Sequence, residues 1–192
     1  MLILGIDPGT QILGYSILDT DAPKPRIVVM DVLYLKRMPD FSQRIKTIFH
    51  NTLRLIDGFH PDFLAIEAPF FGKNVQSMLK LGRAQGVAIA AAILRELPYA
   101  EYEPAMIKQT VTGNGNASKD QVATLLQSIL CFDDHPHYFD ATDALAVAYT
   151  CHMQLSNPIA GVRQELGIKH KSGKSSKRQW ADFVQHNPDI VQ

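Results

Sequence analysis

Two short apolar segments, residues 2–7 and 63–67, each end in an acidic residue, Asp7 and Glu67. Apolar runs of this length bounded by turn residues are typical of buried strands, and a proline-glycine turn follows the first one. If the two strands are adjacent and parallel, both carboxylates emerge at the same edge of the sheet, where α/β folds place their ligands. No other feature of the sequence constrains the fold as strongly.

The hydrophobic pattern predicts further strands and helices around these two segments. Residues 13–19 and 26–35 are typical of strands, and their short connections favour an antiparallel meander of the first three strands. A crossover through a helix would make the strand at 63–67 parallel to the first. The helices are expected at 41–57, 74–96, 104–111, 118–130 and 140–154, and a short strand at 99–103. We therefore expect an α/β fold with a mixed five-stranded sheet flanked by helices.

Two further acids, Asp140 and Asp143, are three residues apart at the start of the last predicted helix, so they lie on one face of it. The alanine, leucine and valine residues around them indicate a buried helix. Ionised carboxylates are unfavourable there without a partner, and no lysine or arginine is a near neighbour in sequence of any of the four acids. A shared divalent cation is the natural partner. Taken singly, Asp140 could equally be a partner of the helix dipole.

The four acids Asp7, Glu67, Asp140 and Asp143 are thus the predicted catalytic and metal-binding residues. A donor set made only of carboxylates favours Mg²⁺, with Mn²⁺ as a substitute, over zinc. Two such ions per subunit, roughly 4 Å apart, would activate a water and stabilise the leaving oxygen in phosphodiester hydrolysis. Some of the acids could instead be helix caps or surface charges, but their combination favours the metal site.

Charge is distributed unevenly along the chain. The 19 basic residues balance the 19 acidic ones, so net charge does not indicate a nucleic-acid partner. Residues 158–192 hold six basic and three acidic residues, which leaves 13 basic and 16 acidic residues in 1–157. A net acidic domain that binds a polyanion must separate its charges or carry metal ions. We expect one domain over 1–156 and a basic, mobile C-terminal segment over 157–192.

Length and cysteine content predict where such a protein works. A chain of 192 residues suffices for one α/β domain with a sizeable core. Its start does not resemble a signal peptide, and no uninterrupted apolar run approaches the roughly 20 residues of a membrane span. Cys131 and Cys151 are expected to be buried thiols in a reducing compartment. The prediction is a cytoplasmic protein without a membrane partner.

The helix expected at 74–96 carries Gly82, Gly86 and Ala90 at intervals of four residues. Glycine inside a helix costs about 1 kcal/mol relative to alanine, so the stripe indicates close approach of another element. Packing on the sheet is one interpretation, and a subunit interface is the other.

Several motifs, in order and spacing, make the chain resemble the RuvC-type Holliday-junction resolvases. They are Gly5-Ile-Asp-Pro-Gly-Thr10 with Gly14-Tyr15, Ala65-Ile-Glu67, Phe70-Phe-Gly-Lys-Asn74, Leu79-Lys-Leu-Gly82, Gln85-Gly-Val-Ala-Ile89, Lys108-Gln-Thr-Val111 and Asp140-Ala-Thr-Asp-Ala-Leu-Ala146. The resemblance covers about residues 1–154. It implies an RNase H-like fold, a homodimer, and symmetric nicking of four-way DNA junctions in recombination and repair. It also makes the branch-migration proteins RuvA and RuvB expected partners.

Residue roles follow from the same resemblance. The family's acidic active-site positions map onto the four acids, although some relatives have a histidine where this chain has Asp143. An aromatic residue used near the junction centre maps to Phe70, with Phe71 as the alternative. Stacking on an unpaired base is worth about 1 to 3 kcal/mol, and packing in the core is the other interpretation of these aromatics.

Two lysines, Lys108 and Lys119, match family residues near the active site or the DNA backbone. Lys119 directly follows Ser118, which forms a capping box with Gln121 after a glycine-rich loop. Backbone N–H groups and an ammonium could meet one phosphate there. An ordinary solvated lysine is the alternative at both positions. The glycine-bearing helix resembles the family's dimer helix, which favours the interface interpretation above.

Two other functions share parts of this pattern. Sugar kinases and acetate kinases open with a similar phosphate loop, but they need two related domains, which 192 residues cannot supply. A catalytically silent RNase H-like binding protein is the second alternative. A complete set of clustered acids argues against it, because a protein that only binds gains nothing from them.

Overall fold

The computed structural model describes residues 1–21, 23–69, 74–132 and 139–156. The strands are β1 (Leu2–Asp7), β2 (Ile12–Asp19), β3 (Arg26–Tyr34), β4 (Phe63–Glu67) and β5 (Tyr99–Tyr102). The helices are α1 (Phe41–Phe59), α2 (Val75–Leu94), α3 (Pro104–Thr112), α4 (Lys119–Leu130) and α5 (Phe139–Ser156). The strands and helices expected from the hydrophobic pattern are confirmed, with ends that shift by about one or two residues.

The five strands form one mixed sheet in the order β3-β2-β1-β4-β5. β2 pairs antiparallel with both β1 and β3, whereas β4 pairs parallel with β1 and with β5. The predicted meander and the predicted parallel crossover are therefore both confirmed. Since Ile6 lies opposite Ile66 in the β1–β4 register, the next residues, Asp7 and Glu67, end neighbouring strands at the same edge.

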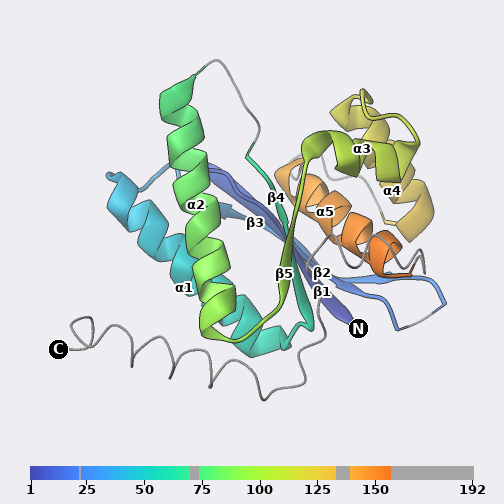
Figure 1. Cartoon of the computed structure of the whole chain (residues 1–192), viewed down its shortest axis with the longest axis horizontal. Helices are drawn as coiled ribbons and strands as arrows, with labels where there is room; N and C mark the ends of the chain where they lie inside the picture. The colour runs from blue at the N-terminus through green and yellow to red at the C-terminus, as the bar shows by residue number, and fades with distance from the viewer. Residues whose placement is uncertain (22, 70–73, 133–138, 157–192) are drawn as a thin grey trace, which may run out of the picture. The chain divides into compact units, whose positions relative to one another are not determined.

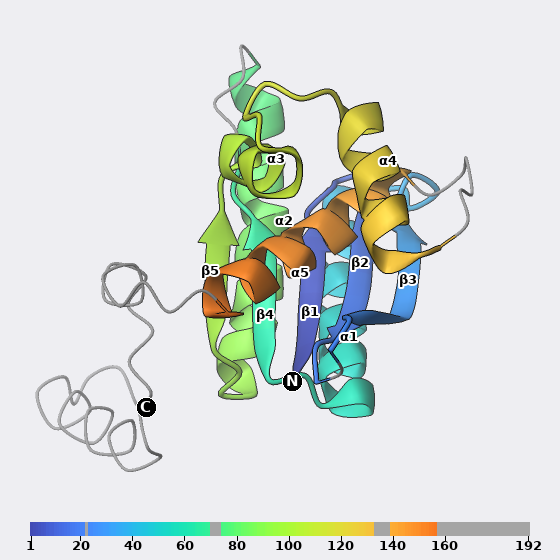
Figure 2. The same ribbon diagram turned by 90° about the vertical axis from the view of Figure 1, so that its right-hand side faces the viewer.

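Helices cover both faces of this sheet. α1 and α2 lie together on one face, and α5 crosses the other face against β1, β2 and β4, with α3 and α4 beside it (Figures 1 and 2). Side chains alternate along β1, so Leu4 and Ile6 pack with Ile48 and Ala88 of the first layer. Gly5, between them, faces α5, since a Cβ built on it would meet the main chain of Ala144.

Local capping determines where two of the helices begin. The Asp40 carboxylate accepts a hydrogen bond of 2.7 Å from the backbone N–H of Gln43 at the start of α1. At α4, the Ser118 hydroxyl accepts from the Gln121 backbone N–H while the Gln121 side chain accepts from the Ser118 backbone N–H. This confirms the predicted capping box and places Lys119 in the first turn of α4.

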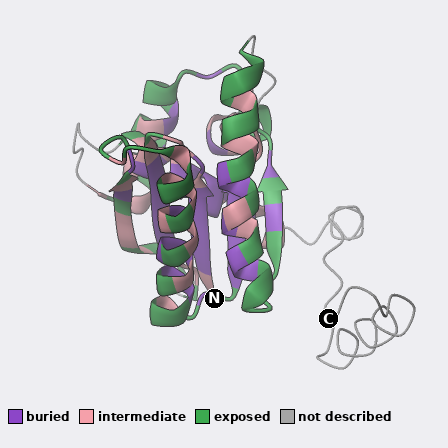
Figure 3. Cartoon of the chain, turned by 90° about the vertical axis from the view of Figure 1, so that its left-hand side faces the viewer, coloured by how far each residue is buried: buried purple, intermediate pink, exposed green. Residues whose placement is uncertain are grey.

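α2 has two different faces. By length and mean hydropathy (1.2) it could cross a membrane, but Ala84 and Ala88 are fully buried against the rest of the domain. On the other face, a Cβ added at Gly82 or Gly86 would meet nothing within 4 Å, and the N-terminal turns are largely exposed (Figure 3). The interpretation that the glycines pack on the sheet is therefore wrong. Alanines pack there, and the glycines face away from it.

The two cysteines differ in burial. Cys151 in α5 is buried as expected, but Cys131, the C-cap residue of α4, is exposed. The prediction of two buried thiols is thus wrong for Cys131.

Phe70, Phe71 and residues 157–192, for which predictions were also made, lie outside the residues that the structure describes.

Candidate active site

Two glycines in the sheet allow α5 to lie very close to β1 and β2. A Cβ built on Gly14 would lie 1.8 Å from the main-chain oxygen of Asp140, and one on Gly5 would lie 2.2 Å from that of Ala144. Both distances are far inside van der Waals contact, so any side chain at either position would push α5 away from the sheet. Gly14 lies opposite Asp7 in the β1–β2 register. The start of α5 is therefore held against the end of β1.

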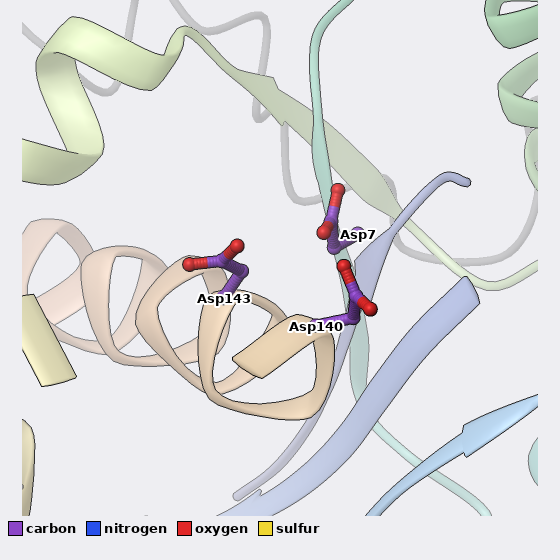
Figure 4. A group of neighbouring side chains, drawn as sticks. All are labelled: Asp7, Asp140 and Asp143. Atoms are coloured by element: carbon purple, nitrogen blue, oxygen red, sulfur yellow. The ribbon is translucent and has the colours of Figure 1, made fainter. Parts of the chain in front are cut away.

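Three of the predicted acids meet at this point. Asp7 comes from the end of β1, and Asp140 and Asp143 come from the first turns of α5 (Figure 4). One carboxylate oxygen of each lies within 4.8 Å of the others, and all three residues are partly buried. The convergence expected for these three acids is confirmed.

Glu67, the fourth predicted acid, ends β4 beside Asp7 but is not part of this group of three. Burial raises the pKa of Asp7 well above its usual range, and the charge of Glu67 raises it further. Burial and the charge of Asp143 likewise raise the pKa of Glu67 to about 7. Glu67 therefore belongs to the same electrostatic cluster, although its oxygens lie outside the tightest group.

Burial, together with the negative charges nearby, makes the ionised forms of Asp7, Glu67 and Asp140 unfavourable. The pKa of Asp140 is also raised, mainly by burial. Each raised pKa means that the site favours either a proton on the carboxyl group or a positive partner near it. A divalent cation bound among the oxygens would be such a partner.

Lys119 supplies part of the missing positive charge. Its Nζ donates a hydrogen bond to the carboxylate of Asp143. Partial burial lowers the pKa of Lys119, but the hydrogen bond to Asp143 and the charges of Asp7 and Asp140 outweigh this effect, so the pKa is raised. Asp143 has no base among its near neighbours in sequence, and its basic partner Lys119 is 24 residues away. The predicted place of Lys119 beside the active-site acids is confirmed.

Lys108, the other predicted lysine, lies on α3, and its charge acts on one acid of the cluster. Its positive charge lowers the pKa of Glu67, against the larger effects of burial and of Asp143. The structure therefore brings Lys108 and Lys119 to the same site as the acids. Contact of either lysine with DNA stays a prediction.

Three residues that hold the cluster in place lie in the family motifs, but the sequence alone assigned no role to any of them. Gly5 and Gly14 lie inside predicted strands, and a glycine inside a strand often indicates close approach of another element. Gln85 is a polar residue among the buried alanines of α2, and its side-chain amide donates to the main-chain oxygen of Glu67 at 3.3 Å. A glutamine at a buried helical position was the available signal.

The sheet order, the helices on both faces and the carboxylates at the ends of β1 and β4 define an α/β protein with an RNase H-like fold. Residues 3–152 match the family described as crossover junction endodeoxyribonuclease RuvC. The chain belongs to this family.

Individual relatives agree with that assignment. The chain is 50% identical over 192 residues to the crossover junction endodeoxyribonuclease RuvC of Porphyromonas gingivalis, covering 99% of this chain and 96% of that protein. It is 46% identical over 192 residues to the protein of the same name from Bacteroides fragilis, covering 99% and 95%. Among solved structures it is similar to Thermus thermophilus RuvC in complex with Holliday junction substrate. There the TM-score is 0.75 at 29% identity, over 81% of this chain and 94% of that one.

Proposed function

We propose that the chain is a structure-selective endonuclease that resolves four-way DNA junctions by paired, symmetric nicks in recombination and repair. The observation that carries this proposal is the convergence of Asp7, Asp140 and Asp143 oxygens within 4.8 Å in a chain of the RuvC family. The complex of the Thermus relative with a Holliday junction substrate supports four-way junctions as the substrate class.

Asp7, Glu67, Asp140 and Asp143 are the proposed metal-binding and catalytic residues. The fit to Mg²⁺ or Mn²⁺ is supported by the donor set, which is all oxygen, and by the raised pKa of Asp7, which a cation would relieve. When bound, two such ions would activate a water and stabilise the leaving oxygen of the phosphodiester. The chain itself presents the carboxylates from two strand ends and one helix, so the ligands are oriented before substrate arrives.

Three other residues are proposed to contact DNA. Lys119 keeps 65% of its side chain exposed while it pairs with Asp143, so its ammonium is accessible to a phosphate of the bound strand. Lys108 is proposed for the same role because its charge acts on Glu67. Phe70 is proposed to stack on an unpaired base near the junction centre, on the strength of its place in the family motif.

Paired nicks need two active sites, and α2 offers the surface for a second copy. Exposed apolar side chains, Val75, Leu79 and Ile93, lie along the same helix as the open Gly82 and Gly86. We propose that this face forms a homodimer.

RuvA and RuvB are proposed partners by resemblance. We propose a cytoplasmic location, because neither cysteine forms a disulfide. We also propose that residues 1–156 form the nuclease domain and residues 157–192 a separate C-terminal segment.

The test is incubation with a synthetic four-way junction and with a linear duplex of the same sequences, in Mg²⁺ or in EDTA. We expect nicks at symmetric positions of the junction in Mg²⁺, none in EDTA, and little cleavage of the duplex. Asp7→Asn should bind the junction as the parent does but cut it at least about 1,000-fold more slowly, because it removes a ligand of the reacting centre. Asp120→Asn is the matched control, since Asp120 is an acid in the first turn of α4 outside the group of three. Equal cutting by Asp7→Asn and the parent would contradict the catalytic assignment.

The same experiment separates the alternatives. Family membership over residues 3–152 counts against a sugar- or acetate-kinase function, and addition of ATP should leave the melting temperature unchanged. A catalytically silent binding protein would bind the junction without nicking it in Mg²⁺. Nicking by the parent protein therefore excludes that alternative, and binding without nicking supports it.

A further inference from the structure

Gln85 is a buried side chain that the proposed chemistry does not use. It lies in the middle of α2, is 6% exposed, and is flanked on the same face by the buried Ala84 and Ala88. A buried amide is costly unless its donors are satisfied, so its partners show what it does. Its Nε2 donates to the Glu101 carboxylate at 2.7 Å and to the main-chain oxygen of Glu67 at 3.3 Å.

Both partners are acceptors only, which determines the orientation of the amide. The main-chain oxygen of Glu67 and the carboxylate oxygen of Glu101 both accept, so the nitrogen of Gln85, with its two N–H groups, faces them. Gln85 therefore joins three elements: α2, the last residue of β4, and β5, which carries Glu101. On the β5 side the chain just past Glu67 is held as well, because the Ala68 N–H donates to the Tyr102 oxygen at 2.9 Å.

We propose that Gln85 is a positioning residue for Glu67. It holds the main chain of Glu67 where β4 ends, so that the carboxylate on the opposite face of the sheet keeps its place beside Asp7. Side chains on a strand move with their main chain, and metal sites lose affinity when the groups that orient a ligand are removed. The inference rests on the proposed function, in which Glu67 is a metal ligand.

The first variant is Gln85→Met, which keeps the length of the side chain and removes both donors. We expect the Mn²⁺ affinity of the DNA-free protein, measured by calorimetry, to fall about tenfold or more. Nicking should then need correspondingly more Mn²⁺, while the dissociation constant for the junction in EDTA stays within about twofold of the parent. Gln127→Met is the control, since Gln127 is a half-buried glutamine on α4 outside the site.

A charge-neutral exchange separates positioning from simple stability. Gln85→Glu combined with Glu101→Gln keeps an amide–carboxylate pair between α2 and β5 but leaves the Glu67 oxygen without the Gln85 donor. We expect the double variant to be more stable toward urea than Gln85→Glu alone, yet to retain the weakened Mn²⁺ affinity. An exchange that restores parental Mn²⁺ affinity would overturn the proposal, and this variant decides the matter if Gln85→Met does not fold.

Glu67→Gln, measured in the same assays, distinguishes failure of the positioning role of Gln85 from failure of the proposed function. If Glu67→Gln loses Mn²⁺ affinity and Gln85→Met does not, the positioning role is wrong and the proposed function stands. If Glu67→Gln binds Mn²⁺ and cuts junctions as the parent does, the metal-ligand assignment of Glu67 fails, and the role of Gln85 fails with it.

Discussion

The carboxyl group of Glu67, at the end of the buried strand β4, makes the stability of the folded protein depend on pH. Its pKa is raised to about 7, first by burial and then by the charge of Asp143. In the unfolded chain a glutamate titrates near its ordinary value of about 4.3. The folded protein without metal therefore binds a proton more tightly than the unfolded chain does, and it loses stability as pH rises between these two values.

Glu67→Gln should remove this penalty. In EDTA the variant should be more stable than the parent by about 1–3 kcal/mol near pH 8, and the difference should vanish at pH ~3, where the Glu67 carboxyl group is protonated in both the folded and the unfolded parent. Urea denaturation at several pH values measures it. A difference that does not change with pH, or a variant less stable at pH 8, would contradict the raised pKa.

At Gly14, the absence of a single atom, the Cβ, allows α5 to approach the sheet. Gly14→Ala places a Cβ 1.8 Å from the main-chain oxygen of Asp140, so α5 must shift away from β2. We expect a loss of roughly 2–4 kcal/mol in the free energy of unfolding, together with weaker Mn²⁺ binding. Gly58→Ala is the matched control, because a Cβ at Gly58 meets nothing within 4 Å and alanine is the better helix former. Equal stability of the two variants would show that α5 is not held by this contact.

Among the elements, α2 shows which structural features the sequence predicts and which it does not. Periodicity predicted the helix, and the Gly82–Gly86 spacing predicted a face without side chains. Periodicity could not tell which face met the sheet, because alanine and glycine are both small and both compatible with close packing. The structure settles this through Ala84 and Ala88, which are buried, whereas Gly86 is exposed.

The proposed dimer face of α2 makes a prediction at this scale. Leu79, with 53% of its surface exposed, would be buried against a second copy. Leu79→Glu should raise the dimer dissociation constant by at least about tenfold, since an unpaired charge would be buried at the interface. Leu125→Glu is the control, an exposed leucine on α4 (39%). Analytical ultracentrifugation should show a dimer for the parent and for Leu125→Glu, and dissociation for Leu79→Glu; equal association of both variants would exclude this face.

The whole molecule explains why the acids could be predicted and the lysine pairing could not. Asp7 and Glu67 end apolar strands, and a parallel crossover between such strands must bring their ends together, so chain topology alone predicts their proximity. The pair between Lys119 and Asp143 depends instead on how α4 lies beside α5. That packing comes from contacts among several elements, and no local pattern encodes it.

The central claim concerns the folded domain as a unit: β1, β4 and α5 bring acids together whose charges are favourable only with bound cations. Calorimetric titration of the DNA-free protein with Mn²⁺ tests it most directly. The account predicts saturable binding by the parent and by Asp120→Asn, and affinity at least about tenfold weaker in Asp7→Asn and in Asp140→Asn. Equal Mn²⁺ affinity in all four proteins, or no binding by the parent, would contradict it.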